Sequence, residues 1–441
     1  MVLTLFVCLF AFVLNVLTLK DGHNWGGDFA QYIIHAQNLI AGRSYTQGIM
    51  LEQTIVYPPG FPLLIAPVIK LAGVNFPLLK IINLLSWYGG LMFLYLLFKT
   101  RVERNTLLLT IGSFAASSFF FVFKQNVLSD IPFMFFCLAG IWAFETRRMA
   151  MAYAFLFCAV LTRSAGLILC GSALFYFWMV QRDMRAVSGI AASAVMAFAI
   201  QALISGGMHP GFWRTLAHDP MATLLHLAQG ASTVWQSMVW FLVPGQTTAT
   251  SWIFTGIEAV FIIASPILYI TALVLFVRTF KTLGMIECFC FFYLGMLLIW
   301  ASFGDSPQNF TRFTLPVIGL LVMLALQHNP KIGWNKWIVG TLLALNLFNI
   351  AGIYKFNDDE LRVRHNAELF NWVTGNTAEN EHFMMWEPRT VTLVTGRVGT
   401  TLAWLAENPP EQWENILKKQ QVRHLVLSRQ GDAHMITRLS A

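Results

Sequence analysis

Charged side chains are scarce in this sequence of 441 residues. Asp, Glu, Lys and Arg make up 12% of it, about half the share found in a typical soluble domain. Hydrophobic residues make up 56%, and the mean hydropathy is +0.60. Because a soluble chain of this length would lack the charge to cover its surface, a soluble enzyme, a disordered chain and collagen are excluded. The composition predicts an all-α polytopic membrane protein.

Motifs that bind nucleotides or zinc are also missing. The sequence contains no Walker loop, no GxGxxG and no HExxH, so neither a nucleotide site nor a dedicated zinc site is expected. The six cysteines lie inside apolar runs, where they act as small hydrophobic residues, and no disulfide is expected. The net charge of +7 comes largely from Lys and Arg in the breaks between apolar runs, which excludes a nucleic-acid partner.

The apolar runs predict about eleven membrane-spanning helices, since one such helix needs about 20 apolar residues. Ile131–Phe144 is a short run. Met151–Val180 is interrupted by Thr162–Gly166, which predicts two short helices that turn back at Arg163. The other predicted spans are Val2–Leu19, Phe76–Phe98, Thr106–Phe123, Ala186–Ile204, Trp252–Val277, Leu283–Ser302, Phe313–Gln327 and Trp337–Ile353.

Basic residues gather in short loops that fall on one side of these spans, which the positive-inside rule makes cytoplasmic. The opposite, non-cytoplasmic side then receives the first long loop and the C-terminus, and the N-terminal run is expected to be an uncleaved first helix with its start inside. The basic residues are Lys99, Arg101, Arg104, Arg147, Arg148, Arg182, Arg185, Arg278, Lys281, Lys331 and Lys336.

The sequence predicts two domains, a transmembrane domain (1–354) and a small C-terminal α/β domain (355–441), where charge density rises. The first exterior loop contains an amphipathic stretch, Phe29–Ile40, which is typical of an interfacial helix. In the C-terminal domain, helices are predicted around Glu360–Val373 and Pro410–Gln420, and strands at His382–Trp386, Val391–Thr395 and Val422–Leu427.

Two acidic residues are predicted at the non-cytoplasmic face. Asp28 follows two glycines that allow a close backbone approach to a ligand, and Asp130 opens a span in Ser129-Asp130-Ile131-Pro132. Taken alone, either residue is better explained by an ordinary structural role at a helix start. Their shared face beside several cations favours a functional role.

The cations predicted at this face are Lys124, Arg163 and Arg312, with Lys80 about one turn inside a span. Arg163 lies between two short spans, where an arginine either snorkels to the interface or pairs in a polar cavity. Charge in such a position indicates function. Arg312 is explained equally as an anchor at the membrane boundary.

Several short motifs, taken in order, resemble those of GT-C membrane glycosyltransferases, in the branch of lipid A aminoarabinose transferases and protein O-mannosyltransferases. The motifs cover the membrane part, and two more in the tail resemble bacterial members. They are Gly27-Asp28-x-Ala30-x-Tyr32, Tyr57-Pro58-Pro59-Gly60-x-Pro62, Leu128-Ser129-Asp130-x-Pro132, Leu161-Thr162-Arg163-Ser164-x-Gly166, Arg312-Phe313-x-x-Pro316, Trp386-x-Pro388-Arg389 and Thr395-Gly396-Arg397.

This resemblance implies transfer of a sugar from a polyprenyl-phosphate carrier, such as undecaprenyl phosphate, to a lipid, glycan or protein hydroxyl, with inversion, on the non-cytoplasmic face. Asp28 matches the catalytic acid of the first loop, and Asp130 matches the second acidic motif. Tyr57 stands where aminoarabinose transferases often have a phosphate-binding lysine, so the donor phosphate is expected at Arg163, Arg312 or Lys124. A divalent metal at Asp28 and Asp130 is left open.

The residues fit this chemistry independently, because transfer from a glycosyl phosphate needs a base for the acceptor and positive charge for the leaving phosphate. A transporter or lipid flippase is the main alternative, although it would place polar groups near the bilayer midplane. A non-catalytic scaffold is a second alternative, in which Asp28 and Asp130 only cap helices.

Overall fold

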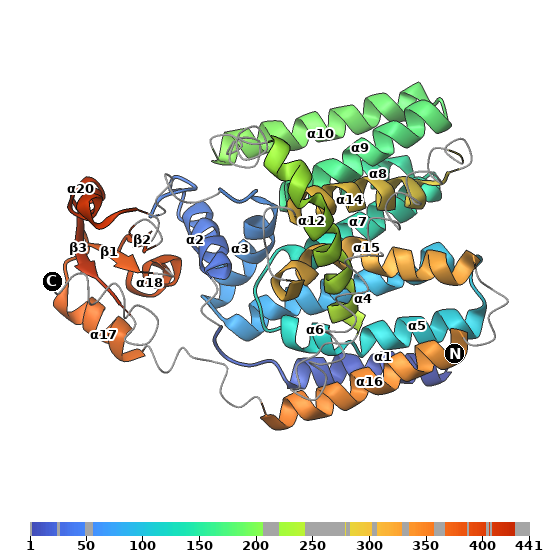
Figure 1. Ribbon diagram of the computed structural model, residues 1–441, viewed down its shortest axis with the longest axis horizontal. Coiled ribbons are helices and arrows are strands. Elements are labelled where there is room, and N and C mark those ends of the chain that lie inside the picture. Colours follow the sequence, from blue (N-terminus) through green and yellow to red (C-terminus); the bar gives the residue numbers. More distant parts are fainter. Residues whose placement is uncertain are drawn as a thin grey trace. The chain divides into compact units, whose positions relative to one another are not determined.

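The computed structural model describes most of the chain (Figure 1). The described residues are 2–23, 27–48, 56–205, 220–242, 278, 283–301, 307–328, 335–356, 367–385, 388–402, 405 and 408–427. The predicted span Trp252–Val277 lies outside the described residues.

The chain divides into two compact units. Unit 1 contains Met1–Leu19, Lys80–Gln125 and Ser129–Asp358, and unit 2 contains Lys20–Leu79, Asn126–Leu128 and Asp359–Ala441. The segment that contains the first predicted exterior loop therefore belongs to the same unit as the C-terminal segment.

Unit 1 is built from apolar helices. Four of the described helical stretches are long and apolar enough to cross a membrane, namely Phe76–Phe98, Arg104–Phe123, Met184–Ser205 and Asn309–His328, and apolar helices of 10–17 residues, such as Met149–Thr162 and Met285–Ala301, are also present. The helices are α1 (Val2–Leu17), α4 (Phe76–Phe98, which begins in unit 2), α5 (Arg104–Ala115), α6 (Ser118–Phe123), α7 (Asp130–Glu145), α8 (Met149–Thr162), α9 (Gly166–Phe175), η1 (Tyr176–Val180), α10 (Met184–Ser205), α12 (Pro220–Leu242), α14 (Met285–Ala301), α15 (Pro307–His328) and α16 (Asn335–Phe356).

The predicted turn at Arg163 is confirmed. Helix α8 ends at Thr162, Arg163 has extended backbone angles (φ −151°, ψ 144°), and α9 begins at Gly166. A Cβ atom at Gly166 would lie 2.6 Å from backbone atoms of Ala159. Because no side chain fits in that space, only glycine lets the chain turn back this closely against α8.

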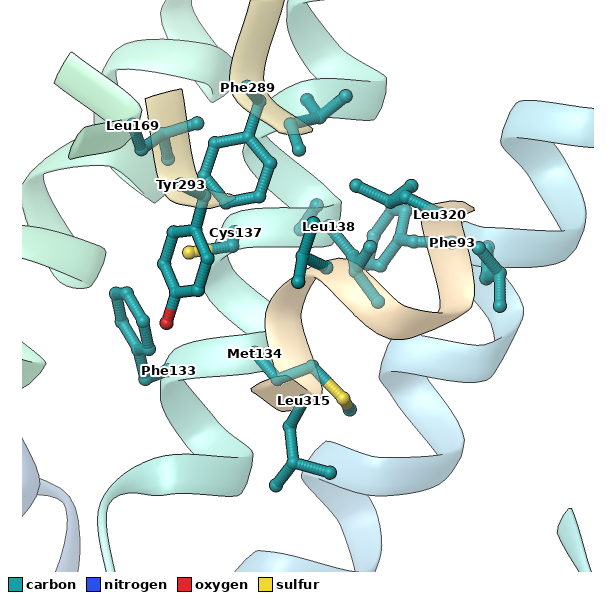
Figure 2. Close-up of a cluster of buried hydrophobic side chains, with 14 of the residues drawn as sticks. Phe93, Phe133, Met134, Cys137, Leu138, Leu169, Phe289, Tyr293, Leu315 and Leu320 are labelled. Atoms are coloured by element: carbon teal, nitrogen blue, oxygen red, sulfur yellow. The ribbon is translucent and has the colours of Figure 1, made fainter. Parts of the chain in front are cut away.

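A dense hydrophobic core holds α4, α7, α9, α14 and α15 together (Figure 2). Tyr293 of α14 is buried in it, with its ring 5.2 Å from Phe289 and 6.5 Å from Phe133. Figure 2 shows Cys137 beside the Tyr293 ring, in agreement with the prediction that the cysteines pack as small hydrophobic residues. The tyrosine hydroxyl donates to the carbonyl of Phe313 over 3.0 Å, which fixes the start of α15 against this core.

In unit 2, α2 (Asp28–Ile40) packs against α3 (Gly60–Ala72) and against α18 (Pro388–Thr395) (Figure 1). The amphipathic stretch predicted at Phe29–Ile40 is thus a helix, and α3 is a second one that follows Pro58 and Pro59. The segment Asn126–Leu128 also belongs to unit 2, and the N–H of Val127 donates to His23 Nε2 over 2.8 Å.

The C-terminal part of unit 2 contains a three-stranded parallel sheet in the order β2-β1-β3. Its elements are α17 (Ala367–Asn376), β1 (His382–Met385), α18, β2 (Gly399–Thr401), η4 (Pro410–Gln412), α20 (Trp413–Lys419) and β3 (Val422–Leu425). The strands predicted at His382–Trp386 and Val422–Leu427 and the helix near Pro410–Gln420 are confirmed.

The strand predicted at Val391–Thr395 is wrong, because these residues belong to helix α18. Its β-branched residues favour a strand locally. However, Pro388 is suited to the first turn of a helix, and Thr390, Val391 and Thr395 are buried at helical spacing. Tertiary packing therefore overrides the local preference.

Candidate functional site

Asp28 lies in a polar cluster within unit 2. Its Oδ1 atom accepts a hydrogen bond from the Tyr57 hydroxyl at 2.7 Å and forms an ion pair with Arg389 Nη1 at 3.2 Å. The same Nη1 atom lies 3.1 Å from Oε1 of Gln31 and 3.4 Å from the Tyr57 hydroxyl. One carboxylate oxygen of Asp28 thus accepts hydrogen bonds from both a phenol and a guanidinium group.

The local sequence explains how Asp28 and Tyr57 meet. Asp28 is the first residue of α2, directly after Gly27, and Tyr57 precedes the two prolines that lead into α3. The Tyr57 ring stacks on Tyr32, one turn after Asp28, with ring centres 4.7 Å apart. The packing of α2 on α3 therefore directs the phenol towards the carboxylate.

Burial, and then the negative charge of Asp28, raise the pKa of Tyr57 far above its ordinary value. Tyr57 stays protonated at neutral pH and is the donor in its hydrogen bond to Asp28. Gly27 is the cap residue of α2, and the Asp28 carboxylate, in the first turn, contacts Tyr57 and Arg389.

A second layer of hydrogen bonds supports this cluster. Gln31 also contacts the ring of His35 at 3.2 Å, and the other ring nitrogen of His35 lies 2.7 Å from the carbonyl of Tyr45. The Tyr45 hydroxyl donates to the carbonyl of Tyr57 over 2.9 Å. The contacts therefore run from Arg389 through α2 and back to Tyr57. Burial lowers the pKa of His35 to about 4, so its ring is neutral at physiological pH.

Asp130 and Arg163 form an ion pair within unit 1. Nη1 of Arg163 donates to Oδ1 of Asp130 over 2.8 Å and to the Ser129 hydroxyl over 3.2 Å. The Asp130 side chain is 2% exposed, and the Arg163 side chain is 19% exposed. Oδ2 of Asp130 is buried and makes no hydrogen bond within the described part of the chain. Since a buried oxygen without a donor is costly, this atom is suited to accept from a ligand.

Arg312 and Arg163 lie against the same aromatic ring. The guanidinium carbon of Arg163 is 5.2 Å from the centre of the Phe313 ring, and that of Arg312 is 4.8 Å from it. Pro316 interrupts the hydrogen-bond ladder of α15 one turn after Arg312, and Tyr293 holds the Phe313 carbonyl. The structure thus brings together three of the predicted residues: Asp130, Arg163 and Arg312.

Lys124 belongs to a different polar cluster of unit 1. Its ammonium group donates to the Thr18 hydroxyl and lies 3.8 Å from the centre of the Phe121 ring. Lys80 donates to Gln125 Oε1 over 3.3 Å, and Gln125 donates to the Thr18 carbonyl over 2.6 Å. Burial, and then repulsion from Lys80, lower the pKa of Lys124 to about 7, so it is charged only in part at neutral pH.

Sequence reasoning did not assign a role to Arg389, although it noted the Pro388-Arg389 motif. The other tail motif is structural. Gly396 has a positive φ of 72°, and buried Arg397 donates to the carbonyls of Thr374, Thr377 and Thr395. Among the residues that the structure describes, no group of three or more His, Cys, Asp or Glu is arranged to hold a metal ion.

Comparison with known proteins gives a structural match alone. No family model and no curated protein sequence matches the chain. The crystal structure of ArnT from Cupriavidus metallidurans in the apo state is similar with a TM-score of 0.51 and 14% identity, over 91% of this chain and 85% of that one. The same protein bound to undecaprenyl phosphate gives 0.50 and 14%, over 95% and 90%. As the motifs predicted, the chain has the fold of ArnT, a GT-C aminoarabinose transferase, over most of its length.

Proposed function

We propose that this protein is a membrane glycosyltransferase of the GT-C type that transfers a sugar from a polyprenyl-phosphate carrier to an acceptor hydroxyl. The observation that carries the proposal is the pairing of each predicted carboxylate with a phenol or guanidinium, Asp28 with Tyr57 and Arg389, and Asp130 with Arg163. The shared fold with ArnT, one structure of which is bound to undecaprenyl phosphate, supports a lipid-linked donor.

In the proposed reaction, the acceptor oxygen attacks the anomeric carbon from the side opposite the phosphate. The bond from that carbon to the phosphate oxygen breaks, and its electron pair leaves with the phosphate. The acceptor proton passes to the Asp28 carboxylate. The products are the glycosylated acceptor, with inverted configuration, and the polyprenyl phosphate.

Asp28 suits the role of base because its carboxylate is 26% exposed and is oriented by Tyr57 and Arg389. Tyr57 keeps its proton and therefore does not compete as a base. A general base of this kind contributes about 10²–10⁴-fold to the rate.

Arg163 and Arg312 are the proposed ligands of the donor phosphate. Two guanidinium groups on one ring provide concentrated positive charge, and arginine binds phosphate through a planar fork. Asp130 holds Arg163 through Oδ1, and its buried Oδ2 is suited to a donor group of the substrate, such as a sugar hydroxyl. Lys124, which is only partly charged, is the weaker candidate for the phosphate.

We place the enzyme in the bacterial inner membrane with its N-terminus in the cytoplasm, and its catalysis and C-terminal domain on the periplasmic side, as the loop charges predict. The C-terminal domain is proposed to span 355–441, after a transmembrane domain of 1–354.

The test is release of undecaprenyl phosphate from radiolabelled undecaprenyl-phosphate sugars by the purified protein with membrane lipid extracts as acceptors. Transfer from the lipid-linked sugar, with none from nucleotide sugars, is the expected result. Accumulation of the lipid-linked sugar in the opposite leaflet of proteoliposomes, without cleavage, would instead identify a flippase.

A further inference from the structure

The contact between Arg389 and Asp28 links residues 361 positions apart in the sequence. We propose that Arg389 is a positioning residue for the reaction: its guanidinium holds the Asp28 carboxylate ionised and in place, so that the C-terminal segment completes the catalytic machinery. This inference rests on the proposed function, in which Asp28 is the base.

The backbone position of Arg389 is set by the packing of β2 against the start of α18. Helix α18 begins at Pro388, and a Cβ atom at Gly399 would lie 2.7 Å from both Cβ and the carbonyl oxygen of Pro388. Only glycine lets β2 approach the start of α18 so closely. The N–H of Gly399 also donates to the Thr392 hydroxyl over 3.2 Å. The sheet therefore holds the first turn of α18, which carries Arg389.

The guanidinium group of Arg389 lies within hydrogen-bond distance of three acceptors. Nη1 lies 3.1–3.4 Å from Gln31 Oε1, Asp28 Oδ1 and the Tyr57 hydroxyl. Gln31 and Asp28 lie on neighbouring positions of the first turn of α2, and Tyr57 lies before α3. A single nitrogen thus ties α18 to both elements that orient the carboxylate, which a shorter or uncharged side chain cannot reproduce.

Charge is the second part of the argument. An arginine next to a carboxylate favours its ionised form, which is the form that accepts a proton. Titratable groups beside the pair in the described part of unit 2 include Tyr57 and Tyr32, with His35 further along α2. Burial keeps Tyr57 protonated and His35 neutral at physiological pH. Arg389 is therefore the group of this set that supplies positive charge.

The first experiment measures the ionisation of Asp28 without any turnover. Dicyclohexylcarbodiimide reacts with protonated carboxyl groups, and mass spectrometry of the peptide that contains Asp28 gives the modified fraction as a function of pH. In Arg389→Gln, the pH of half-modification should rise by about one unit or more, as expected for loss of a neighbouring arginine. Arg423→Gln removes an exposed arginine that pairs with Glu381 in the same unit and should match wild type.

Arg389→Lys should give a smaller rise, because a lysine cannot contact Asp28, Gln31 and Tyr57 together. If Arg389→Gln does not fold, the pH of half-modification of Asp28 in Arg389→Lys tests the proposal instead. A pH of half-modification equal to that of wild type in the folded variants would overturn the proposal.

The second readout is transfer kinetics. Arg389→Gln should lower kcat about tenfold or more with a KM for the donor within about threefold of wild type, and the acid limb of the kcat profile should move to higher pH. A raised KM with unchanged kcat would contradict positioning and indicate a direct contact with the donor. If the wild-type protein shows no transfer, the proposed function fails, whereas the modification experiment still decides the role of Arg389.

Discussion

Arg163 donates to the Asp130 carboxylate over 2.8 Å and so joins the turn between α8 and α9 to the first residue of α7. The two residues lie 33 positions apart and are largely buried. A paired charge of this kind is strongly destabilised when one partner is lost, because the other is left without compensation.

The first prediction concerns this pair. Asp130→Asn and Arg163→Gln should each reduce transfer about tenfold or more, and the double variant should lose less than the product of the two single losses, because Asp130 acts in part by holding Arg163. The initial transfer rates of the wild type, the two single variants and the double variant give the coupling between Asp130 and Arg163. Losses that simply multiply in the double variant would show that Asp130 and Arg163 act independently.

The second prediction concerns the proposed base. Asp28→Asn keeps the size of the side chain and an oxygen that accepts from Tyr57 and Arg389, so the melting temperature should stay near that of wild type. Transfer should fall at least about a hundredfold, because the amide cannot take up the acceptor proton. The loss should exceed that of Asp130→Asn. Near-normal turnover of Asp28→Asn would return Asp28 to a purely structural role.

The third prediction concerns the donor phosphate. Arg312→Lys and Arg163→Lys keep the charge but lose the planar fork and its stacking on Phe313, so each should lose most of the activity. Binding of undecaprenyl phosphate, measured with a fluorescent analogue, should weaken in parallel. Lys124→Gln is the comparison. If that variant loses binding while both arginine variants retain it, the phosphate site lies with Lys124.

The fourth prediction concerns pH. The folded protein keeps His35 neutral down to about pH 4, whereas an unfolded chain protonates histidine near pH 6.5. The stability from neutral His35 is therefore complete above pH 6.5 and is lost as the pH falls towards 4. The melting temperature in detergent should decline over this range. The His35 ring stacks on the Tyr45 ring with ring centres 3.9 Å apart, and His35→Phe, which can keep this stacking, should flatten the decline. His328→Gln, at an exposed position, serves as control; an equal decline in His35→Phe would contradict the prediction.

The fifth prediction concerns sidedness. In a background without native cysteines, Ser44→Cys and Glu414→Cys should react with an impermeant maleimide in intact cells, since both are exposed residues of unit 2. Arg185→Cys, in a basic loop, should react only after the membrane is made permeable. Reaction of Arg185→Cys in intact cells, with Glu414→Cys protected, would reverse the topology.

Local sequence patterns predicted those parts of the structure whose conformation is set by neighbouring residues in the sequence. Thr162–Gly166 interrupts an apolar run, and the chain turns there. The amphipathic stretch after Asp28 is a helix. By contrast, α18 was predicted as a strand, since its β-branched residues mask a helical start set by Pro388.

The candidate residues were predicted individually, but their partners were not. Charge and sidedness indicated Asp28 and Asp130, whereas the contact of Asp28 with Arg389 depends on how α18 packs on α2. No local spacing encodes that packing. The Pro388-Arg389 pair was the available signal, because an arginine in the first turn of a helix opposes the helix dipole and needs an acidic partner elsewhere.

Unit 2 is built from segments at both ends of the chain, so its parts are synthesised at different times. Asp28 leaves the ribosome early, and Arg389 follows 361 residues later, on the order of tens of seconds at ordinary rates of synthesis. The contact can therefore form only after the helices that lie between the two residues in the sequence have been synthesised. A product that terminates before Arg389 would lack this contact, so formation of the contact is tied to near-complete translation of the chain.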